Sequence, residues 1–492
     1  MAALASVRAP RPRIPAAVVP ILVVLALLCV SVVHGGGRAA PLSGALIVVS
    51  VLAVGHRRLL SWPSMVTLLL GVILFIPINR YDLPVRVPFA SEPYRATVLL
   101  ILAAWGTSLV VDRRVTARPL GIERQLKLIV GVVLLSELAN PGRLADTGSY
   151  VLKALTFFAT FVLVVYFLGS VVRDRAAIDR VLRMLVGGGA VVAGAAVLER
   201  QSQFNVFDQL HSVLPILQFH PVEQEVRNGA VRAVASAGHP IELATVLAVL
   251  FPLAIYLVAT TSQRRWWAAA GLILLGNFAT GSRTGFIALT AVLVVFLWLR
   301  PRDVCRCWPA LLPTLVLLHV FVPGAIGGVT GSLFGGNLIA EQSHQVKGNA
   351  RLANNRIADW GPSLSEYASH NPLVGEGFGT RVTGFGNPDG NAAILDNQWL
   401  KSLLETGLLG IAGWFWLLGG SIRRLGREAK RRRGSPDGWL PTALAGAIAG
   451  FAVAMFTYDA FSFYMGTFLL YVLVALAAVT LIELRRPAEA RA

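Results

Sequence analysis

Hydrophobic runs long enough to cross a bilayer recur along almost the whole chain. Windows of about 19 residues pick out 14 candidate spans, each flanked by polar or charged positions. The candidate spans cover residues 14–33, 41–54, 59–78, 94–111, 126–138, 150–172, 181–198, 241–260, 266–280, 284–299, 308–326, 400–419, 438–455 and 463–484. The fifth run is so short that it is either a span or a re-entrant segment. The first is not expected to be a cleaved signal peptide, because no small-x-small cleavage site follows it. The pattern predicts an all-α integral membrane protein with about 12–14 transmembrane helices.

Composition excludes a soluble protein. Of the 492 residues, 55% are hydrophobic and 14% are charged, whereas soluble chains carry about 25% charged residues. Cys29 lies in an apolar run, and the Cys305/Cys307 pair offers only two of the four ligands that zinc needs, so neither a disulfide framework nor a metal site is expected.

The net charge of +18 fits a topology signal better than a nucleic-acid surface. If the N-terminus is cytoplasmic, the predicted spans place 29 of the 44 Lys and Arg residues on the cytoplasmic side. The C-terminus is then cytoplasmic as well, and no nucleic-acid partner is expected. In this orientation the two long connections, 199–240 and 327–400, are external, so any chemistry is expected on the external face.

The late external loop has helix and turn signals of its own. A first helix is predicted over about 349–360, an interruption at Gly361-Pro362, and a second short helix that ends at 370–372. The GEGFG sequence at 375–379 follows no strand and opens no apolar helix, so it is a poor dinucleotide fingerprint. A flexible backbone that allows close approach is the better interpretation.

Two arginines stand near the predicted external membrane surface. Arg283 lies in ATGSRTGF, between two spans that leave almost no loop, and Arg232 lies eight residues before the span that Pro240 opens. Arg283 is either a snorkelling anchor at a helix end or a phosphate clamp, since a guanidinium can hold a diphosphate bidentately. Gly281 and Gly285 would allow the backbone to approach closely.

Polar residues near the starts of two spans have two interpretations each. His239 is either a capping or hydrogen-bonding group or a catalytic base, and Glu242 is either in an ion pair or in the active cavity. Asp396 and Asn397 stand at the mouth of a later span, where Asp396 is either a site residue or a helix N-cap. Glu405, about two turns further on, is either functional or a partner in a hydrogen bond between helices.

In the late loop, Arg356 and Trp360 are one helical turn apart. One interpretation is an amphipathic helix on the membrane surface with solvated cations, and the other is a contribution to the site.

With these pieces in order, the region from about 232 to 416 resembles the O-antigen ligase and Wzy polymerase superfamily of bacterial surface polysaccharide biosynthesis. The stretches that carry the resemblance are RAVASAGHP, ATGSRTGF, RIADWGPSLSEYASHNPLVGEGFGT and DNQWLKSLLETGLLG. The resemblance implies a metal-independent, inverting glycosyltransferase without a cofactor. Such an enzyme transfers a glycan from undecaprenyl diphosphate to a hydroxyl group of a glycan or glycolipid acceptor. It implies a multi-pass protein of the bacterial plasma (inner) membrane with its active site facing the periplasm.

Three regions are expected on this basis. Residues 1–231 would form an N-terminal transmembrane bundle with short loops, and 232–420 a ligase- or polymerase-like catalytic region that includes the 327–400 loop. Residues 421–492 would form a basic cytoplasmic loop and the last two transmembrane helices.

The resemblance also implies roles for individual residues. Arg232 and Arg283 match the arginines thought to bind the lipid diphosphate, and Arg356 is expected to assist them. Together Arg356 and Trp360 match an Arg-x3-Trp element of the large loop. Gly375 and Gly377 match its Pro-x2-Gly-x-Gly element. His239, Asn397 and Glu405 are further candidates.

Asp396 departs from the pattern of the family, because many ligases have a histidine at that position. Arg232, Arg283 and Asp396 are nevertheless the expected catalytic residues. An aspartate with an ordinary pKa near 4 accepts a proton from a hydroxyl only weakly unless it is desolvated, so its role as a base stays open.

Two rival functions fit the sequence less well. A transporter or flippase of lipid-linked oligosaccharides should show two similar halves, and the 327–400 loop has no counterpart in the first half. Another type of polyprenyl-phosphate glycosyltransferase would have an acidic pair in a long first external loop, but residues 34–40 contain no Asp or Glu. The sequence does not distinguish a polymerase from a ligase, since the two differ in acceptor and not in donor chemistry.

Overall fold

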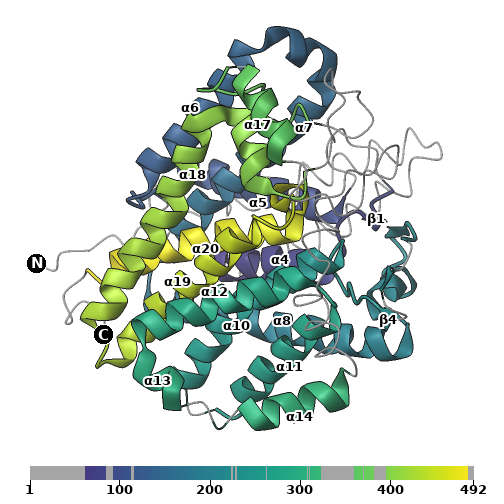
Figure 1. Ribbon diagram of the computed structural model, residues 1–492, viewed down its shortest axis with the longest axis vertical. Helices are drawn as coiled ribbons and strands as arrows, with labels where there is room; N and C mark the ends of the chain where they lie inside the picture. The colour runs from purple at the N-terminus through teal and green to yellow at the C-terminus, as the bar shows by residue number, and fades with distance from the viewer. Residues whose placement is uncertain are drawn as a thin grey trace, which may run out of the picture. The chain divides into compact units, whose positions relative to one another are not determined.

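The computed structural model (Figure 1) describes most of the chain, with gaps. The described residues are 61–84, 92–111, 116–222, 225–227, 230–261, 263–306, 309, 311–322, 360–369, 371–381 and 395–485. The chain divides into two units, Met1–Val66 and Thr67–Ala492. Helix α4 begins in the first unit, and all later elements belong to the second.

Helices dominate the described residues, which confirms the all-α prediction. The long helices are α4 (Trp62–Phe75), α5 (Pro93–Val111), α6 (Glu123–Ala139), α7 (Pro141–Val171), α8 (Arg175–Ser202), α10 (Pro240–Thr260), α11 (Arg265–Ala279), α12 (Arg283–Leu299), α14 (Leu311–Phe321), α18 (Gln398–Arg431), α19 (Trp439–Ala454) and α20 (Tyr464–Glu483). Short helices are η1 (Val206–Gln209), α9 (Leu210–Val213), α13 (Pro301–Arg306), α17 (Trp360–Ser369), η4 (Pro436–Gly438) and η5 (Ala460–Ser462).

Each predicted span that falls in the described part coincides with one of the long helices. Seven of these helices are long and apolar enough to cross a membrane, and an eighth span results if two bent segments are counted as one. That pair is Glu123–Ala139 and Pro141–Gly148, bent by 92°. It contains the short run 126–138, for which a span and a re-entrant segment were the two expectations. The first two predicted spans, 14–33 and 41–54, lie outside the described residues.

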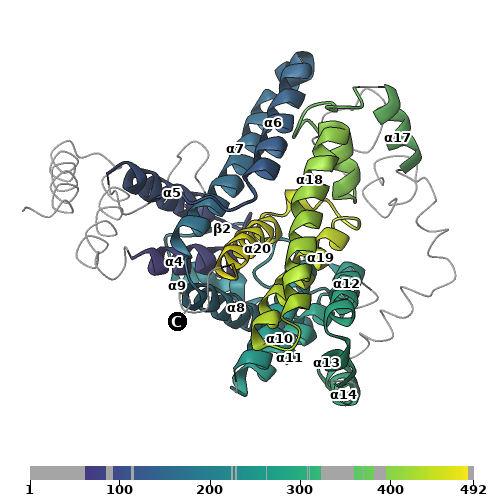
Figure 2. The same ribbon diagram turned by 90° about the vertical axis from the view of Figure 1, so that its left-hand side faces the viewer.

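Helices α10 and α20 form the centre of the bundle. Helix α10 packs against α8, α11, α12, α19 and α20, and α20 also packs against α7 and α18. Helix α18 runs beside α6 and α19 (Figure 2). Buried Leu, Val and Ala side chains fill these contacts, and small residues such as Gly276 bring backbones close together, as is usual between membrane helices.

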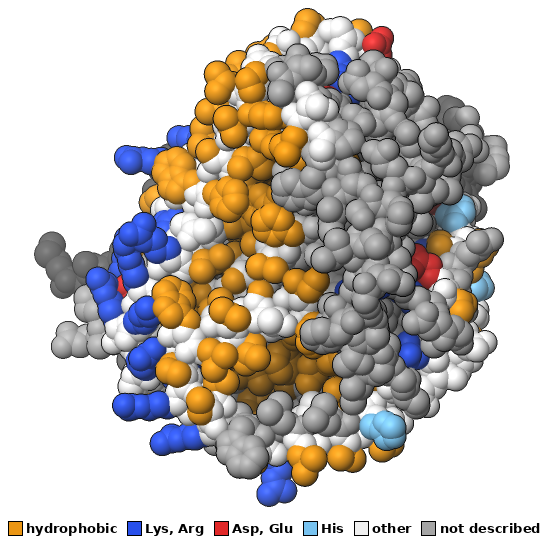
Figure 3. Space-filling model, in the orientation of Figure 1, with side chains coloured by type: hydrophobic (Ala, Val, Ile, Leu, Met, Phe, Trp, Pro, Cys, Tyr) orange, Lys and Arg blue, Asp and Glu red, His pale blue; other side chains and the backbone are white. Residues whose placement is uncertain are grey.

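Basic side chains gather at one end of the helices, called here the basic end. Arg300 donates to the carbonyl oxygen of Ser435, Arg432 to that of Leu484 and Arg433 to that of Leu299. Figure 3 shows Lys and Arg along the edge where Figure 1 places α13, with a band of hydrophobic side chains beside it. A cationic fringe next to an apolar band is the arrangement that the positive-inside rule expects.

The opposite end, called here the site end, carries the irregular structure. Strand β1 (Tyr81–Asp82) pairs antiparallel with β2 (Gln218–Phe219), and β3 (Val226–Arg227) pairs antiparallel with β4 (Ala230–Val231). Helices α10, α12, α18 and α20 begin at this end, where their first residues contact one another.

Helix α18 is broken at Gly407, where φ is 64° and ψ is −166°. The break removes helical partners from nearby backbone groups, and the GEGFG loop replaces them. The amide nitrogens of Glu376 and Gly377 donate to the carbonyl oxygens of Leu404 and Glu405, at 2.9 and 3.2 Å. Backbone groups inside a span need partners in the protein, so the loop and the broken helix stabilise each other.

Part of the late loop behaves as predicted, but the interruption predicted at Gly361-Pro362 is wrong, because both residues lie in the first turn of a continuous helix. Helix α17 begins at Trp360, has Pro362 in its first turn and ends at Ser369, just before the predicted stop. The helix predicted over 349–360 lies almost wholly outside the described residues.

We predict that Gly407→Ala lowers the melting temperature of the purified protein. An alanine Cβ would clash with the carbonyl group of Leu373, and the left-handed conformation alone costs about 1–3 kcal/mol for a non-glycine residue. Gly419→Ala is the matched control, because this glycine of α18 faces open space and alanine favours a helix by about 1 kcal/mol. Thermal unfolding followed by tryptophan fluorescence measures the melting temperature of both variants. Equal melting temperatures for Gly407→Ala and Gly419→Ala would contradict a helix break that requires glycine at position 407.

Candidate functional site

Two arginine side chains approach the turn between α11 and α12, and a third arginine begins α12 directly after it. Arg283 opens α12, and Arg232 donates from Nε to the carbonyl oxygen of Thr280 at 3.3 Å. Gly281 has a φ of 60°, and a Cβ there would lie 3.8 Å from Nη1 of Arg200 and from Cγ of Arg232. We call Arg200, Arg232 and Arg283, with Gly281 between them, the arginine turn. The expectation that Arg232 and Arg283 lie at the same end of the helices is confirmed.

Local hydrogen bonds fix this turn. Thr280 donates from its hydroxyl to the carbonyl oxygen of Asn277 at 2.7 Å, and the amide of Ser282 donates back to the Thr280 hydroxyl at 3.2 Å. Asn277 also donates to the carbonyl oxygen of Ala244 at 2.6 Å. A Cβ at Gly285 would lie within 3 Å of Asn277, so the expected close approach at this glycine is confirmed. The result is a short connection with little freedom.

Glu225 joins Arg232 to His239. The register of β3 and β4 places Glu225 opposite Arg232, whose backbone amide donates to the carbonyl oxygen of Glu225 at 2.9 Å. The Glu225 carboxylate forms an ion pair with Nη1 of Arg232 and lies 2.7 Å from Nε2 of His239. The hydrogen bond with His239 and the charge of Arg232 lower the pKa of the Glu225 carboxyl, so it is ionised at neutral pH.

His239 caps helix α10. Its Nδ1 accepts from the amide of Ile241 at 3.1 Å, so Nε2 carries the proton that points to Glu225. The capping alternative is therefore confirmed, and neither ring nitrogen has a free lone pair in this arrangement.

Glu242 takes neither of its two expected places. Its carboxylate oxygens accept from the backbone amides of Gly238, at 2.9 Å, and of Gly466, at 3.1 Å. The side chain thus ties the start of α10 to the start of α20, and these backbone donors compensate for its burial.

A cavity of about 320 Å³ lies between α7, α18, α20 and the GEGFG loop. Aromatic side chains form much of its wall, among them Phe157, Phe378 and Tyr464. The charged, amide and aliphatic hydroxyl side chains that line it are Lys153, Arg381, Gln398, Lys401, Glu405, Ser462 and Thr467. We call it the polar-aromatic cavity. Its volume falls in the range of roughly 300–1,000 Å³ that is usual for small-ligand sites.

Glu405 lies in the wall of this cavity and is only 2% exposed. Lys401, one helical turn earlier, places its Nζ 4.0 Å from Oε1 of Glu405 and 2.8 Å from Oδ2 of Asp459. Oε1 of Glu405 accepts no hydrogen bond from the described residues. Its side chain therefore faces an ion pair and a cavity, instead of the hydrogen bond between helices that was one expectation.

Asn397, and not Asp396, caps helix α18. The Asn397 side chain accepts from the amide of Leu400 at 3.1 Å. The capping alternative for Asp396 is therefore wrong, because the helix begins one residue later than that alternative required. Asp396 is partly exposed, directly before the cap, and does not line the polar-aromatic cavity.

Gly375 and Gly377 show why the GEGFG loop is rich in glycine. Their φ angles are 73° and 115°, and a Cβ at Gly375 would clash with the carbonyl oxygen of Leu404. The expected close approach of the backbone is confirmed. Between the two glycines, Glu376 forms an ion pair with Arg143 of α7 at 2.7 Å and lies 3.7 Å from Arg381.

Two candidates of the late loop are not placed. Arg356 lies outside the described residues, and Trp360 begins α17 with a side chain that is outside them as well. The proposed Arg-x3-Trp element therefore stays a prediction.

The arginine turn and the polar-aromatic cavity adjoin across the connection between α19 and α20. On one side, the hydroxyl of Thr457 pairs with that of Thr284, next to Arg283, at 2.8 Å. On the other side, Asp459 binds Lys401. The ring of Phe463 contacts that of His239, with centroids 5.4 Å apart, and the residues on either side of Phe463 line the cavity.

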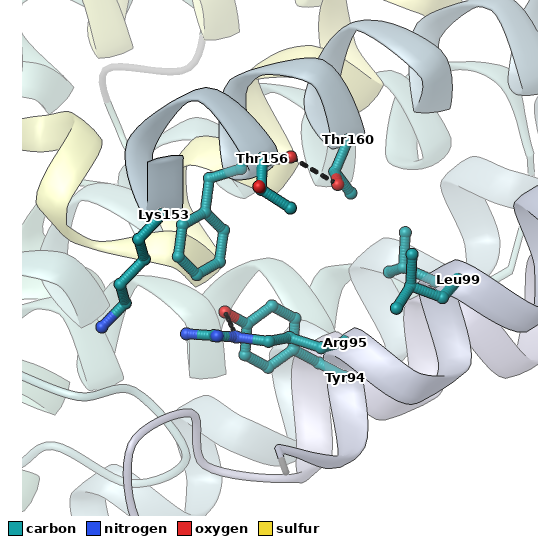
Figure 4. A pocket seen from close by; sticks show the side chains of 8 residues that line it. Tyr94, Arg95, Leu99, Lys153, Thr156 and Thr160 are labelled. Carbon is teal, nitrogen blue, oxygen red and sulfur yellow. Dashed lines mark hydrogen bonds between the residues drawn. The ribbon is translucent and has the colours of Figure 1, made fainter. Parts of the chain in front are cut away.

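A smaller hollow of about 20 Å³ lies between α5 and α7 and shares Lys153 and Phe157 with the cavity (Figure 4). Arg95 of α5 is fixed there by an ion pair with Glu92 at 2.7 Å, and its guanidinium carbon lies 4.4 Å from the ring centre of Phe157. Figure 4 shows Tyr94 and Arg95 on α5 facing Thr156 on α7.

Sequence reasoning missed several of these groups. Lys401 stands four residues before Glu405 within a predicted span, which is the spacing of a helical ion pair. The Asn228-Gly229 sequence between two short polar-apolar runs is typical of a two-residue hairpin and would have paired Glu225 with Arg232. No local signal connects Asp459 with Lys401. Within the described residues, no group of three or more His, Cys, Asp and Glu side chains is placed to hold a metal ion.

Comparison with known protein families supports the same part of the chain. A family model described as O-antigen ligase matches residues 268–415, from within α11 to within α18. The match contains Arg283, the GEGFG loop and Glu405, whereas Arg232 and His239 precede it. No curated protein matches the chain. The chain thus carries a region of the O-antigen ligase family at residues 268–415.

Proposed function

We propose that this protein is a membrane glycosyltransferase that moves a glycan from undecaprenyl diphosphate to a hydroxyl group of a glycan or glycolipid acceptor. The reaction inverts the anomeric centre and needs no metal ion. The observation that carries the proposal is the arginine turn at the end of a hairpin of the family's domain, where Arg200 and Arg232 approach Gly281 and Arg283 follows two residues later in the chain.

The chemistry of the donor explains why arginines suffice. A polyprenyl diphosphate is already activated, so the protein must chiefly stabilise the charge that develops on the departing diphosphate. A guanidinium can contact two phosphate oxygens at once. Preorganised donors of this kind contribute roughly 2–4 kcal/mol each in the transition state. Arg232 and Arg283 are the proposed diphosphate ligands, with Arg356 as a third.

Glu225 sets the position and the charge balance of Arg232 in this binding site. Its carboxylate holds Arg232 in place and balances the charge of that guanidinium before the donor arrives. A diphosphate competes for the same guanidinium, because it is the stronger multivalent acceptor.

The basic end supports one orientation of the protein in the membrane. Arg264, Arg300 and Arg433 lie at the end of the helices opposite the arginine turn, and the positive-inside rule assigns such an end to the cytoplasm. The arginine turn then faces the outside of the bacterial plasma membrane, where the lipid-linked glycan and its acceptor meet. Two carboxylates near the start of α18, Asp396 and Glu405, are the candidates to accept the proton of the attacking hydroxyl.

The function is tested by incubating the purified protein with a lipid-linked repeat unit, alone and with candidate acceptors. We expect release of the lipid diphosphate together with a longer glycan. A ladder that forms without another acceptor identifies a polymerase, and transfer only to an added glycolipid identifies a ligase. No release under either condition would contradict the proposal.

We predict that Arg283→Lys loses about 10²–10³-fold in turnover, nearly as much as Arg283→Ala, because lysine lacks the planar two-pronged donor. Both variants should insert into the membrane and melt normally. A snorkelling anchor needs only a cation and would tolerate lysine.

Arg264→Ala is the control for this comparison, since Arg264 is an exposed arginine at the opposite end of α11. It should keep normal turnover. A fully active Arg283→Lys enzyme would exclude the clamp.

A further inference from the structure

We infer that the polar-aromatic cavity binds the acceptor sugar, and that Glu405 accepts the proton of its attacking hydroxyl. This inference rests on the proposed function and adds to it a second subsite and a further catalytic residue.

The composition of the wall selects the class of ligand. A sugar ring has apolar C–H faces, which stack on aromatic rings, and hydroxyl edges, which need donors and acceptors. The cavity offers both, with Phe378 and Tyr464 among its aromatic rings and Gln398 and Glu405 among its polar groups. A polyprenyl chain is apolar and would leave these polar side chains without hydrogen-bonding partners.

The wall holds three cations, Lys153, Lys401 and Arg381, and the last two face carboxylates, which disfavours a diphosphate beside them. Lys401 is paired with Asp459 at 2.8 Å and lies 4.0 Å from Glu405. Arg381 faces Glu376 at 3.7 Å. Because carboxylates balance these cations, a polyanion would meet buried negative charge, whereas a neutral sugar would meet hydrogen-bonding partners.

The aromatic side is rigid before any ligand binds. The rings of Phe157 and Tyr464 stack with centroids 4.1 Å apart and planes 16° apart. Arg95 packs on the other face of Phe157 and is itself held by Glu92, so Phe157 supports the ring of Tyr464. A preformed platform reduces the ordering cost of binding a weakly held sugar.

One carboxylate oxygen of Glu405, Oε1, is buried in the wall without a hydrogen bond from the described residues, and we assign the proton to this atom. The nearby Lys401 is held by Asp459 and donates to Ser462 at 3.4 Å. The backbone of Glu405 is fixed, since its carbonyl oxygen accepts from Ser136 at 2.6 Å and from Gly377 at 3.2 Å. A carboxylate that is held in place next to a cavity is suited to general base catalysis.

Asp396 is placed less favourably. It precedes the cap of α18 and is not part of the wall of the cavity. Glu405 lies about two turns further along the same helix, inside the wall.

The transfer step then balances as follows. The acceptor hydroxyl oxygen forms a bond to the anomeric carbon of the donor glycan, and the bond from that carbon to the diphosphate breaks. The electron pair leaves with the diphosphate, which the arginine turn stabilises. The hydroxyl proton passes to Oε1 of Glu405. The two subsites contact the same Thr457–Phe463 connection, and the inference places the anomeric carbon between them.

The test uses the full-length protein in detergent with a lipid-linked repeat unit as donor. It compares the transfer of the glycan to two nucleophiles, a sugar hydroxyl and azide. A sugar hydroxyl needs a base, whereas azide needs none. We expect Glu405→Gln to lose at least about 10²-fold in turnover with the hydroxyl acceptor, and to form the glycosyl azide at a rate within threefold of the wild type. Tyr464→Ala should raise the KM for the hydroxyl acceptor about tenfold and leave azide transfer unchanged, while Tyr464→Phe keeps most of the stacking surface.

Glu428→Gln is the matched control, with the same substitution at the basic end of the same helix. Equal loss of hydroxyl and azide transfer in Glu405→Gln would show a structural role and overturn the inference, as would retained hydroxyl transfer. If Asp396→Asn alone lost hydroxyl transfer and kept azide transfer, the base would be Asp396. Failure of the wild type to release its glycan to either nucleophile would overturn the proposed function itself, whereas an active Glu405→Gln overturns only the inference.

Discussion

The break of helix α18 at Gly407 is the constraint on which the candidate site depends. Backbone groups freed inside a span must find partners in the protein, and the GEGFG loop supplies them through Glu376 and Gly377. That exchange holds Phe378 and Arg381 against Lys401 and Glu405, which line one cavity. Only glycine fits at Gly375 and Gly407, because each has a left-handed backbone in contact with another main chain. The glycine-rich motif is thus a packing device that builds a polar site within apolar helices.

The two halves of the candidate site solve different electrostatic problems. The arginine turn collects cations at the end of a hairpin, where Glu225 compensates Arg232. The polar-aromatic cavity keeps its cations paired with carboxylates and leaves Oε1 of Glu405 without a hydrogen bond from the described residues. The first arrangement suits a polyanionic leaving group, and the second suits a neutral sugar. Their contact across the α19–α20 connection is what a transfer between two substrates requires.

The sequence predicted the helices well because a bilayer sets their length and hydrophobicity. It also placed Arg232 and Arg283 at one end, since spans alternate in direction. It did not predict the pairing of Lys401 with Asp459, because that contact joins residues far apart in the chain. The roles of His239 and Asn397 as caps, and of Glu242 as a partner of Gly466, depend on the conformations of turns. Hydropathy does not report those conformations.

The central claim is a direct displacement at the anomeric carbon, with arginines on the leaving diphosphate and a carboxylate on the incoming hydroxyl. The stereochemistry of the product tests it most directly. A lipid-linked repeat unit of known anomeric configuration is transferred by the purified protein, and the new linkage is assigned by NMR coupling constants. The account predicts inversion in every product. Retention of configuration would require a covalent glycosyl intermediate and would contradict the account.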